Sequence, residues 1–563
     1  MEKPRNSIWL YSEIKKKKVH IFTSIVATAF SNFFAIFTSL FVMVVYNKII
    51  PNDALTTLLT VLVGVGILIL SDTLLKFLKG RIINAASADI ERTLQIALYD
   101  KVISWDMQKV PKLSGSSATL VKDLENIVEL FTSTTISVAV GLPFIFIYLS
   151  VIYVIGYQIA YVSLVLIFLI LASNLIFYIL VQEQANKSKT SFIEKSSQFI
   201  ETLANLETIK SVGDYTFFGQ KWNRVVDKNN VVTFKLKDSM GHVSTLNGAI
   251  TSLGQILIVS VGAYLVINEK ITTGALIASV LLNGRAQQPV MQLSNLIQKF
   301  ATASVSKRKL DDVFNSVSNE EARRENLRIK NVVGDIFVKE LAYSIEETRA
   351  TILDIPYLKI KDGEKIGIVG SVGSGKSTFL KIISGVYTPT TGTVSIGSYN
   401  INAINQSILR DHVGYLGQTP GIFSGSIREN ICLTKRNATD EEIDQALKLS
   451  GFDRILSQFP NGLSFTLSEN GRELSGGQKQ ILALTRSFLT NPKYVLLDEP
   501  TSAMDPRHEL LFIKNMHQMI ADRTLLVVTH RKPILKLVDR ILVIENGRVV
   551  VDGGRDEVLK KFA

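Results

Sequence analysis

The stretch EKIGIVGSVGSGKSTFL, residues 364–380, decides the fold of the C-terminal half of this chain. It begins as a short apolar strand, continues as a glycine-rich loop and ends as the start of a helix. The spacing G-x-x-x-x-G-K-S runs from Gly370 to Ser377, which is the pattern of a phosphate-binding loop. Backbone N–H groups of such a loop, together with the helix N-terminus, surround phosphate oxygens. The stretch therefore predicts a nucleotide-binding α/β domain.

The loop also supplies the cation and the metal ligand that ATP with Mg²⁺ requires. Lys376 is expected to reach the β- and γ-phosphates, and the Ser377 hydroxyl is expected to bind Mg²⁺. The candidate nucleotide-binding residues are Gly370, Ser371, Val372, Gly373, Ser374, Gly375, Lys376, Ser377 and Thr378. A tight strand–turn–helix without ligand is the alternative, and the flanking strand and helix favour the nucleotide.

Polar residues follow three further apolar strands. KYVLLDEP (493–500) ends in Asp498, a candidate Mg²⁺ ligand, and Glu499, which can polarise the attacking water. His530 ends the next strand, where it can hydrogen-bond the γ-phosphate, and Gln418 follows another strand and can ligate Mg²⁺. Ligands bind at the carboxyl edge of such parallel sheets. Glu499, His530 and Gln418 are therefore the predicted catalytic residues, the alternative being solvated strand ends.

The first half of the chain has the composition of a membrane domain. Of 563 residues 47% are hydrophobic, and the excess lies before about residue 319. A helix needs about 20 apolar residues to cross a bilayer. Six segments meet this length, at about 20–46, 55–77, 133–156, 158–182, 245–267 and 272–296. The last two are weaker, because they contain polar residues such as Asn247, Asn283, Arg285 and Gln287, which are expected to face other helices or a water-filled path.

Charge orients these segments. Lys15–Lys18 precede the first span, so the N-terminus is predicted to be cytoplasmic, and with six spans the C-terminus is cytoplasmic too. The chain is thus expected to be a multi-pass membrane protein. Its net charge of +12 is partly placed beside apolar runs, which favours a lipid bilayer over nucleic acid as the partner. Cys432 is the single cysteine, so the chain cannot form an internal disulfide.

The predicted organisation is a transmembrane domain over residues 1–318, a charged linker over 319–332 and a nucleotide-binding domain over 333–563. Two long links between spans show helical periodicity and are predicted to extend into the cytoplasm. Their tips, near 111–116 and 213–218, are expected to contact the soluble domain.

SENGRELSGGQ, residues 468–478, looks like half of an anion site. It offers the Ser475 hydroxyl and bare glycine backbone but no loop lysine. Together with GSVGSGKST, Gln418, LLDEP, SAMD and His530, the LSGGQ segment resembles the ATP-binding cassette (ABC) family. Six spans before one such domain resemble its exporter branch. The predicted fold is a six-helix transmembrane domain followed by an α/β P-loop ATPase domain.

The resemblance implies an assembly. In this family two cassettes face each other head to tail, and each ATP lies between the phosphate loop of one and the LSGGQ segment of the other. Ser475, Gly476, Gly477 and Gln478 would then bind the nucleotide held by Lys376 of a second copy. The chain is thus expected to be a half-transporter that hydrolyses ATP as a homodimer, and Glu469 is expected to contact the cytoplasmic helix tips.

The family usually places an aromatic residue on adenine about 25 residues before the first loop glycine. Here that position is Ile345, with Tyr343 two residues away. Either Ile345 offers a weaker apolar face or Tyr343 takes the role, and a strand core position is the alternative for Tyr343.

Two stretches concern the cargo. VVYNKIIPNDALTTL (44–58) and TTGALIASVLLNGRAQQPV (272–290) resemble type I secretion transporters, which export unfolded polypeptides with a periplasmic adaptor (membrane fusion) protein and an outer-membrane channel. The N-terminal peptidase-like domain of many such relatives is expected to be absent. An exporter of lipids or small molecules is the alternative. A channel gated by ATP binding is disfavoured, because gating alone does not need Glu499 and His530.

Overall fold

A computed structural model describes residues 8–107, 119–131, 133–315, 329, 331–345 and 350–562. The chain divides into two compact units, one of residues 1–103 and 111–316 and one of residues 104–110 and 317–563. Most of the predicted linker at 319–332 lies outside the described residues. The predicted tip at 111–116 lies wholly outside them.

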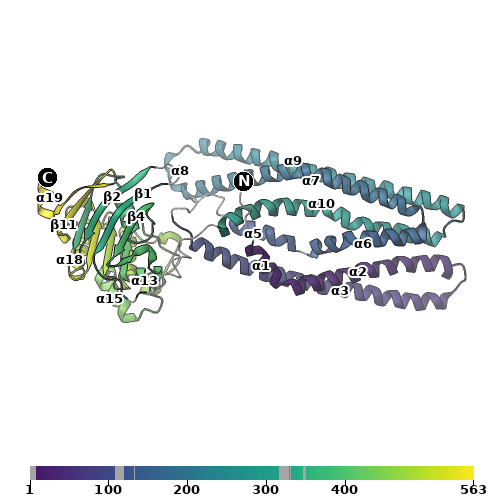
Figure 1. Ribbon diagram of the computed structural model, residues 1–563, viewed down its shortest axis with the longest axis horizontal. Helices are drawn as coiled ribbons and strands as arrows, with labels where there is room; N and C mark the ends of the chain where they lie inside the picture. Colours follow the sequence, from purple (N-terminus) through teal and green to yellow (C-terminus); the bar gives the residue numbers. More distant parts are fainter. Residues whose placement is uncertain are drawn as a thin grey trace. The chain divides into compact units, whose positions relative to one another are not determined.

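The first unit is helical (Figure 1). Its helices are α1 (Ile8–Lys16), α2 (Lys18–Val44), α3 (Leu55–Ile103), α5 (Leu120–Val128), α6 (Ser133–Gly156), α7 (Ile159–Ala204), α8 (Leu206–Val212), α9 (Tyr215–Ile267) and α10 (Thr273–Asn315). A π-helical turn, Val45–Ile49, extends α2, and a 3₁₀ turn, Glu129–Phe131, follows α5. Helices satisfy their own backbone hydrogen bonds, as the hydrocarbon core of a bilayer requires.

The helices of this unit pack lengthwise in pairs. α7 lies along α9, α2 along α3, and α10 along both α6 and α7 (Figure 1). A buried cluster that includes Ile152, Ile170 and Ile258 joins them. At Gly141 a Cβ would lie 2.6 Å from the Cγ of Pro289, so only glycine lets α6 approach α10 this closely.

By length and composition, five helical stretches among the described residues can cross a membrane. They are Lys18–Ile49, Leu55–Ile103, Leu120–Gly156, Ile159–Tyr178 and Tyr215–Ile267. The predicted sixth span falls in α10, which is less apolar because it carries residues such as Asn283, Arg285 and Gln287. α3 continues beyond its predicted span to Ile103 and α7 to Ala204. Between α8 and α9 the chain turns at Gly213, with φ +75°, and Asp214 caps α9.

The second unit is built on a six-stranded sheet with the strand order β12-β11-β3-β10-β9-β6. These strands are β3 (Lys365–Val369), β6 (Val413–Leu416), β9 (Tyr494–Asp498), β10 (Thr524–Val528), β11 (Arg540–Glu545) and β12 (Arg548–Gly554). All neighbours are parallel except β12, which is antiparallel to β11. Every residue of β9 and of β10 is buried, as expected of continuous apolar strands covered on both faces.

A second, antiparallel sheet has the order β2-β1-β4-β5. Its strands are β1 (Ile336–Ser344), β2 (Thr351–Ile360), β4 (Thr391–Ile396) and β5 (Tyr399–Asn400). Phe379 of α12 (Lys376–Ile383) lies in the apolar core that this sheet shares with the parallel sheet. A two-stranded sheet pairs β7 (Gly425–Ser426) with β8 (Thr466–Leu467).

The remaining helices pack against these sheets, several of them in the apolar core that includes Phe452, Phe488 and Phe512. They are α12 (Lys376–Ile383), α13 (Gln406–His412), α14 (Ile427–Ile431), α15 (Asp440–Ser450), α16 (Phe452–Leu456), α17 (Gly476–Phe488), α18 (Pro506–Met519) and α19 (Arg555–Phe562). The parallel arrangement brings the carboxyl ends of β3, β6, β9 and β10 to one edge. The polar residues predicted at three strand ends lie at the ends of β6, β9 and β10, and they are Gln418, Asp498, Glu499 and His530.

Candidate functional site

The phosphate loop connects β3 to α12 and depends on glycine backbone. Gly370 has φ +152°, and a Cβ there would lie 2.0 Å from the carbonyl oxygen of Ile544. Gly375 has φ +99° and precedes the first residue of α12. Between them, Ser371, Val372 and Gly373 are exposed, whereas Ser374 is buried. The loop therefore holds its outer turn open to solvent while both ends are anchored against the sheet.

Lys376 lies at the mouth of this loop. Its Nζ donates hydrogen bonds to the carbonyl oxygens of Gly370 at 2.8 Å and Ser371 at 2.7 Å. Burial lowers the pKa of Lys376, and the carboxylates of Glu499 and Asp498 act in the opposite direction. The side chain thus carries its cation into the loop, where phosphate oxygens are the expected partners.

Asp498, at the end of β9, offers a free carboxylate oxygen. Its carboxylate is hydrogen-bonded to Ser377, and burial raises its pKa. Oδ1 is buried and has no hydrogen-bond partner among the described residues. Carboxylate and hydroxyl oxygens are the ligands that Mg²⁺ prefers. This pair therefore fits the predicted metal ligands, and the unpaired oxygen is the group that a cation would satisfy.

Glu499 joins the other two predicted catalytic residues. Gln418 Nε2 donates to Glu499 Oε2 at 3.1 Å, and His530 Nε2 lies 3.9 Å from Glu499 Oε1. Glu499 has a positive φ of 49°, and its backbone N–H donates to the carbonyl of Val528. Side chains held in sparsely populated backbone conformations cluster at functional sites. The strand ends of β6, β9 and β10 thus meet around one carboxylate that can orient a water molecule.

Two residues that the sequence motifs did not predict form hydrogen bonds around this cluster. Buried Gln480, on α17, donates to the carbonyl oxygen of Glu499 at 3.4 Å and to Ser502 Oγ at 3.0 Å. Arg531 donates to the carbonyl oxygens of Ser502 and Met504, both at 3.2 Å. Gln480 stands two residues after the LSGGQ segment, and Arg531 stands directly after His530. Their closeness to these motifs in the sequence was the one feature that could have indicated a role at the site.

The LSGGQ segment forms the N-terminus of α17. Ser475 caps this helix by accepting from the N–H of Gln478, and the Gln478 side chain accepts from the N–H of Ser475. Ser475 and Gly476 are exposed. At Gly477 a Cβ would lie 2.8 Å from the carbonyl oxygen of Ala503, so a larger residue would not fit.

A cavity of about 180 Å³ beside Ser475 shows which residues of the same chain the segment faces. Among the described residues, this cavity is lined by Gln458, Gln478 and His508 with their neighbours and by no phosphate-loop residue. Within this cavity, the exposed serine therefore has no phosphate-loop partner from its own chain. Ser475 is exposed at the start of α17, as a site completed by another molecule would need.

The two candidate adenine residues differ in accessibility. Tyr343 is 7% exposed and stacks on Tyr387 with ring centroids 5.7 Å apart. Ile345 is 39% exposed. The structure thus places Tyr343 in the core of the antiparallel sheet and leaves Ile345 as the accessible candidate.

Ile345→Tyr is expected to tighten ATP binding by roughly fivefold or more, because stacking of a base on an aromatic ring contributes about 1–3 kcal/mol. Titration of the purified protein with a fluorescent ATP analogue measures this change. Ile345→Ala is the matched control and is expected to weaken binding. Unchanged affinity in both variants would remove Ile345 from the adenine site.

Comparison with known proteins identifies the family. Residues 353–502 match the family described as ABC transporter, and residues 21–290 match the ABC transporter transmembrane region. A leukotoxin translocation ATP-binding protein of Bibersteinia trehalosi is 30% identical over 97% of this chain and 77% of its own length. The chain belongs to the ABC transporter family. The resemblance and the fold class inferred from the motifs are confirmed.

Two further relatives match this ABC transporter over the same extent. A toxin RTX-I translocation ATP-binding protein of Actinobacillus pleuropneumoniae is 29% identical, and the alpha-hemolysin translocation ATP-binding protein of Escherichia coli is 28% identical. Each match covers 97% of this chain and 77% of the relative. The matches support a half-transporter of the exporter type that hydrolyses ATP and crosses the membrane several times.

A solved structure shows the same fold. A bacterial Atm1-family ABC exporter with ATP bound superposes with a TM-score of 0.81 at 19% identity, covering 99% of this chain and 97% of the other. The exporter arrangement of a helical domain followed by an ATPase domain is thereby established for this ABC transporter.

Proposed function

We propose that this ABC transporter is the ATPase subunit of a type I secretion system and exports an unfolded polypeptide across the inner membrane. The observation that carries this proposal is the similarity, over 97% of the chain, to proteins named for the translocation of protein toxins. It works as a homodimer with a periplasmic adaptor and an outer-membrane channel, and both chain termini are cytoplasmic.

The two stretches that resemble secretion transporters also contact each other in the structure. The Asn47 side chain donates to Thr272 Oγ1 at 2.7 Å and accepts from the N–H of Gly274 at 3.0 Å. A Cβ on Gly274 would lie 2.5 Å from Asn47 Oδ1, so glycine is needed for the contact. The turn between α2 and α3 is thus hydrogen-bonded to the turn between α9 and α10. Asn47 and Thr272, which form one of these bonds, lie 225 positions apart in the sequence.

The ATPase unit would use Mg²⁺ with its nucleotide, with Ser377, Asp498 and Gln418 as ligands. The bound cation would neutralise phosphate charge. Lys376 and His530 bind the γ-phosphate, Glu499 orients the water, and Gln418 positions Glu499 through its hydrogen bond. Ser475 and Gly477 of the second copy close the site from the other side, so hydrolysis requires both cassettes.

Purification of the Glu499→Gln variant from native membranes with ATP tests the proposal. The expected result is enrichment of an adaptor protein and a secreted polypeptide relative to wild type, because the ATP-bound state persists. The same fold also serves export of lipids or small molecules. ATPase activity stimulated by a lipid or drug, with neither adaptor nor polypeptide retained, would replace the proposal with that alternative.

A further inference from the structure

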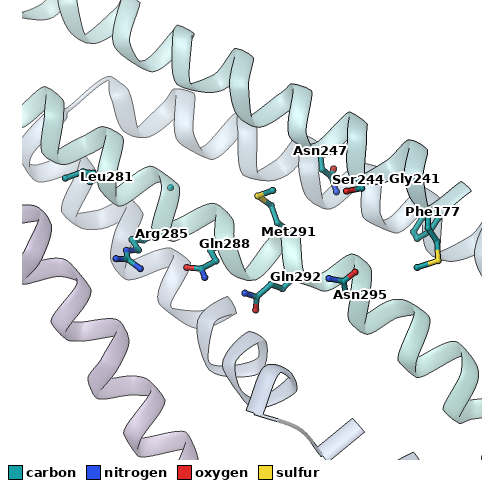
Figure 2. A pocket seen from close by; sticks show the side chains of 12 residues that line it. Phe177, Gly241, Ser244, Asn247, Leu281, Arg285, Gln288, Met291, Gln292 and Asn295 are labelled. Carbon is teal, nitrogen blue, oxygen red and sulfur yellow. The ribbon is translucent and has the colours of Figure 1, made fainter. Parts of the chain in front are cut away.

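α10 presents a stripe of polar side chains to two cavities inside the transmembrane unit. The larger cavity, of about 820 Å³, lies between α7, α9 and α10 (Figure 2). Arg285, Gln288, Gln292 and Asn295 project from α10 along it. Their spacing of three, four and three residues places them on one face of the helix. We call these four residues the α10 stripe.

The second cavity, of about 220 Å³, lies between α2, α3, α6 and α10. It is also lined by Arg285, Gln288 and Gln292. Three members of the α10 stripe therefore line both cavities, which form one polar surface along this helix.

Arg285 lies deep in the transmembrane region. It is the twelfth residue after Thr273, the first residue of α10, which places it about 18 Å along the helix. Among the described residues no group pairs with its guanidinium, and the side chain is exposed in the cavity. An arginine at this depth is costly and marks a functional path. Its partner is therefore expected to be a passing anion.

The amides of the α10 stripe match a peptide backbone. Each Gln or Asn side chain offers both a donor and an acceptor, as each peptide unit does. Asn32, which lines the second cavity, has a buried Nδ2 without a hydrogen-bond partner among the described residues. From Arg285 to Asn295 the stripe spans about 15 Å, which corresponds to about four or five residues of extended chain.

The described lining of the second cavity is basic. Lys76, Lys79 and Arg285 line the second cavity, and no carboxylate is among the described lining residues of either cavity. Lys76 is paired with Asp72 at 2.6 Å. Lys79, in contrast, donates to the neutral hydroxyl of Ser137 at 2.8 Å. Among the described residues, Lys79 and Arg285 are thus two cations of this surface that form no ion pair with a carboxylate.

We propose that the α10 stripe binds an extended, acidic segment of the exported polypeptide. The amides of Gln288, Gln292 and Asn295 bind its backbone regardless of sequence, and Arg285 with Lys79 binds its carboxylates. This inference rests on the proposed export of polypeptides and adds a charge preference. The surface also has room, because a Cβ on Gly284 would meet no atom within 4 Å.

The test measures binding of three flexible peptides to the full-length dimer in nanodiscs of zwitterionic lipid. The peptides have the same length and Gly/Ser background and carry Glu, Gln or Lys at the same positions. Fluorescence anisotropy is expected to show the tightest binding for the Glu peptide and the weakest for the Lys peptide. Arg285→Gln is expected to weaken binding of the Glu peptide by about tenfold and to leave the Gln peptide unaffected.

Matched variants separate a binding role from a structural one. Arg285→Lys keeps the charge and is expected to keep the preference for the Glu peptide. Arg224→Gln removes an exposed arginine of α9 outside both cavities and is expected to change nothing. Gly284→Leu places a large side chain in the larger cavity and is expected to weaken the binding of all three peptides. Gly64→Leu, at a glycine of α3 that is equally open, is its control.

Equal binding of the three peptides by wild type, or an Arg285→Gln variant that keeps the preference, would overturn the charge selection and leave polypeptide export standing. If no peptide binds while an anionic lipid stimulates the ATPase, the inference fails together with the proposed function. The two failures are therefore distinguishable.

Discussion

Glu499→Gln is expected to lower steady-state ATP hydrolysis by about 100-fold or more, because general-base assistance contributes about 10²–10⁴ to such rates. The glutamine side chain has the same size as glutamate, and its amide oxygen can still accept the hydrogen bond from Gln418. It cannot act as a general base toward water. ATP binding is expected to persist, since Glu499 lies beyond the phosphate loop rather than in it. Phosphate release and nucleotide binding, measured on the same preparation, check both statements.

Lys376→Ala provides the contrasting variant for Glu499→Gln. It removes the cation that now lies 2.7–2.8 Å from two loop carbonyls, so nucleotide binding itself is expected to fall. The two variants should therefore fail at different steps. Normal turnover in Glu499→Gln would remove this carboxylate from its assigned role.

Ser475→Arg is expected to abolish ATP-driven closure of the two cassettes while each cassette still binds nucleotide. Ser475 is exposed and its hydroxyl is the cap of α17. A long arginine side chain at this position would occupy the space of the incoming phosphate and loop. Because Cys432 is the only cysteine, Cys432→Ser leaves a chain in which one introduced surface cysteine can carry a spin label. The distance between the labels of the two copies, with and without ATP, reports closure.

Ser475→Ala separates the cap from the steric effect. Loss of the cap costs about 1 kcal/mol of helix stability but leaves the phosphate space open, so closure should be weakened and not lost. Full ATP-driven closure in Ser475→Arg would refute the assignment of this segment to the site of the second copy.

Much of the ATPase unit could be predicted from the sequence because its signals are local. Strand, loop and helix follow one another within residues 364–380, and the polar residues after β6, β9 and β10 stand directly at the strand ends. Family membership follows from the same motifs. Gln480 and Arg531 stand beside motifs, but their roles could not be predicted, because each contacts groups that the fold brings to it from elsewhere in the chain.

The membrane unit was harder to predict in detail. The hydropathy of α10 falls below that of the other spans, because it carries Arg285 and several amides. Only the structure shows that these polar side chains line cavities. The contact of Asn47 with Gly274 joins two turns that no local pattern links.

The sequence by itself determined the family, the ATPase chemistry and the ligands expected at the phosphate loop, because these depend on residue types at fixed short spacings. Only the tertiary structure decided that Tyr343 is buried while Ile345 is accessible, and that Glu499 is held by Gln418 and Gln480. It alone showed that Arg285 and the amides of α10 share one surface. Burial and side-chain contact depend on how distant elements pack, and spacing along the chain does not contain that information.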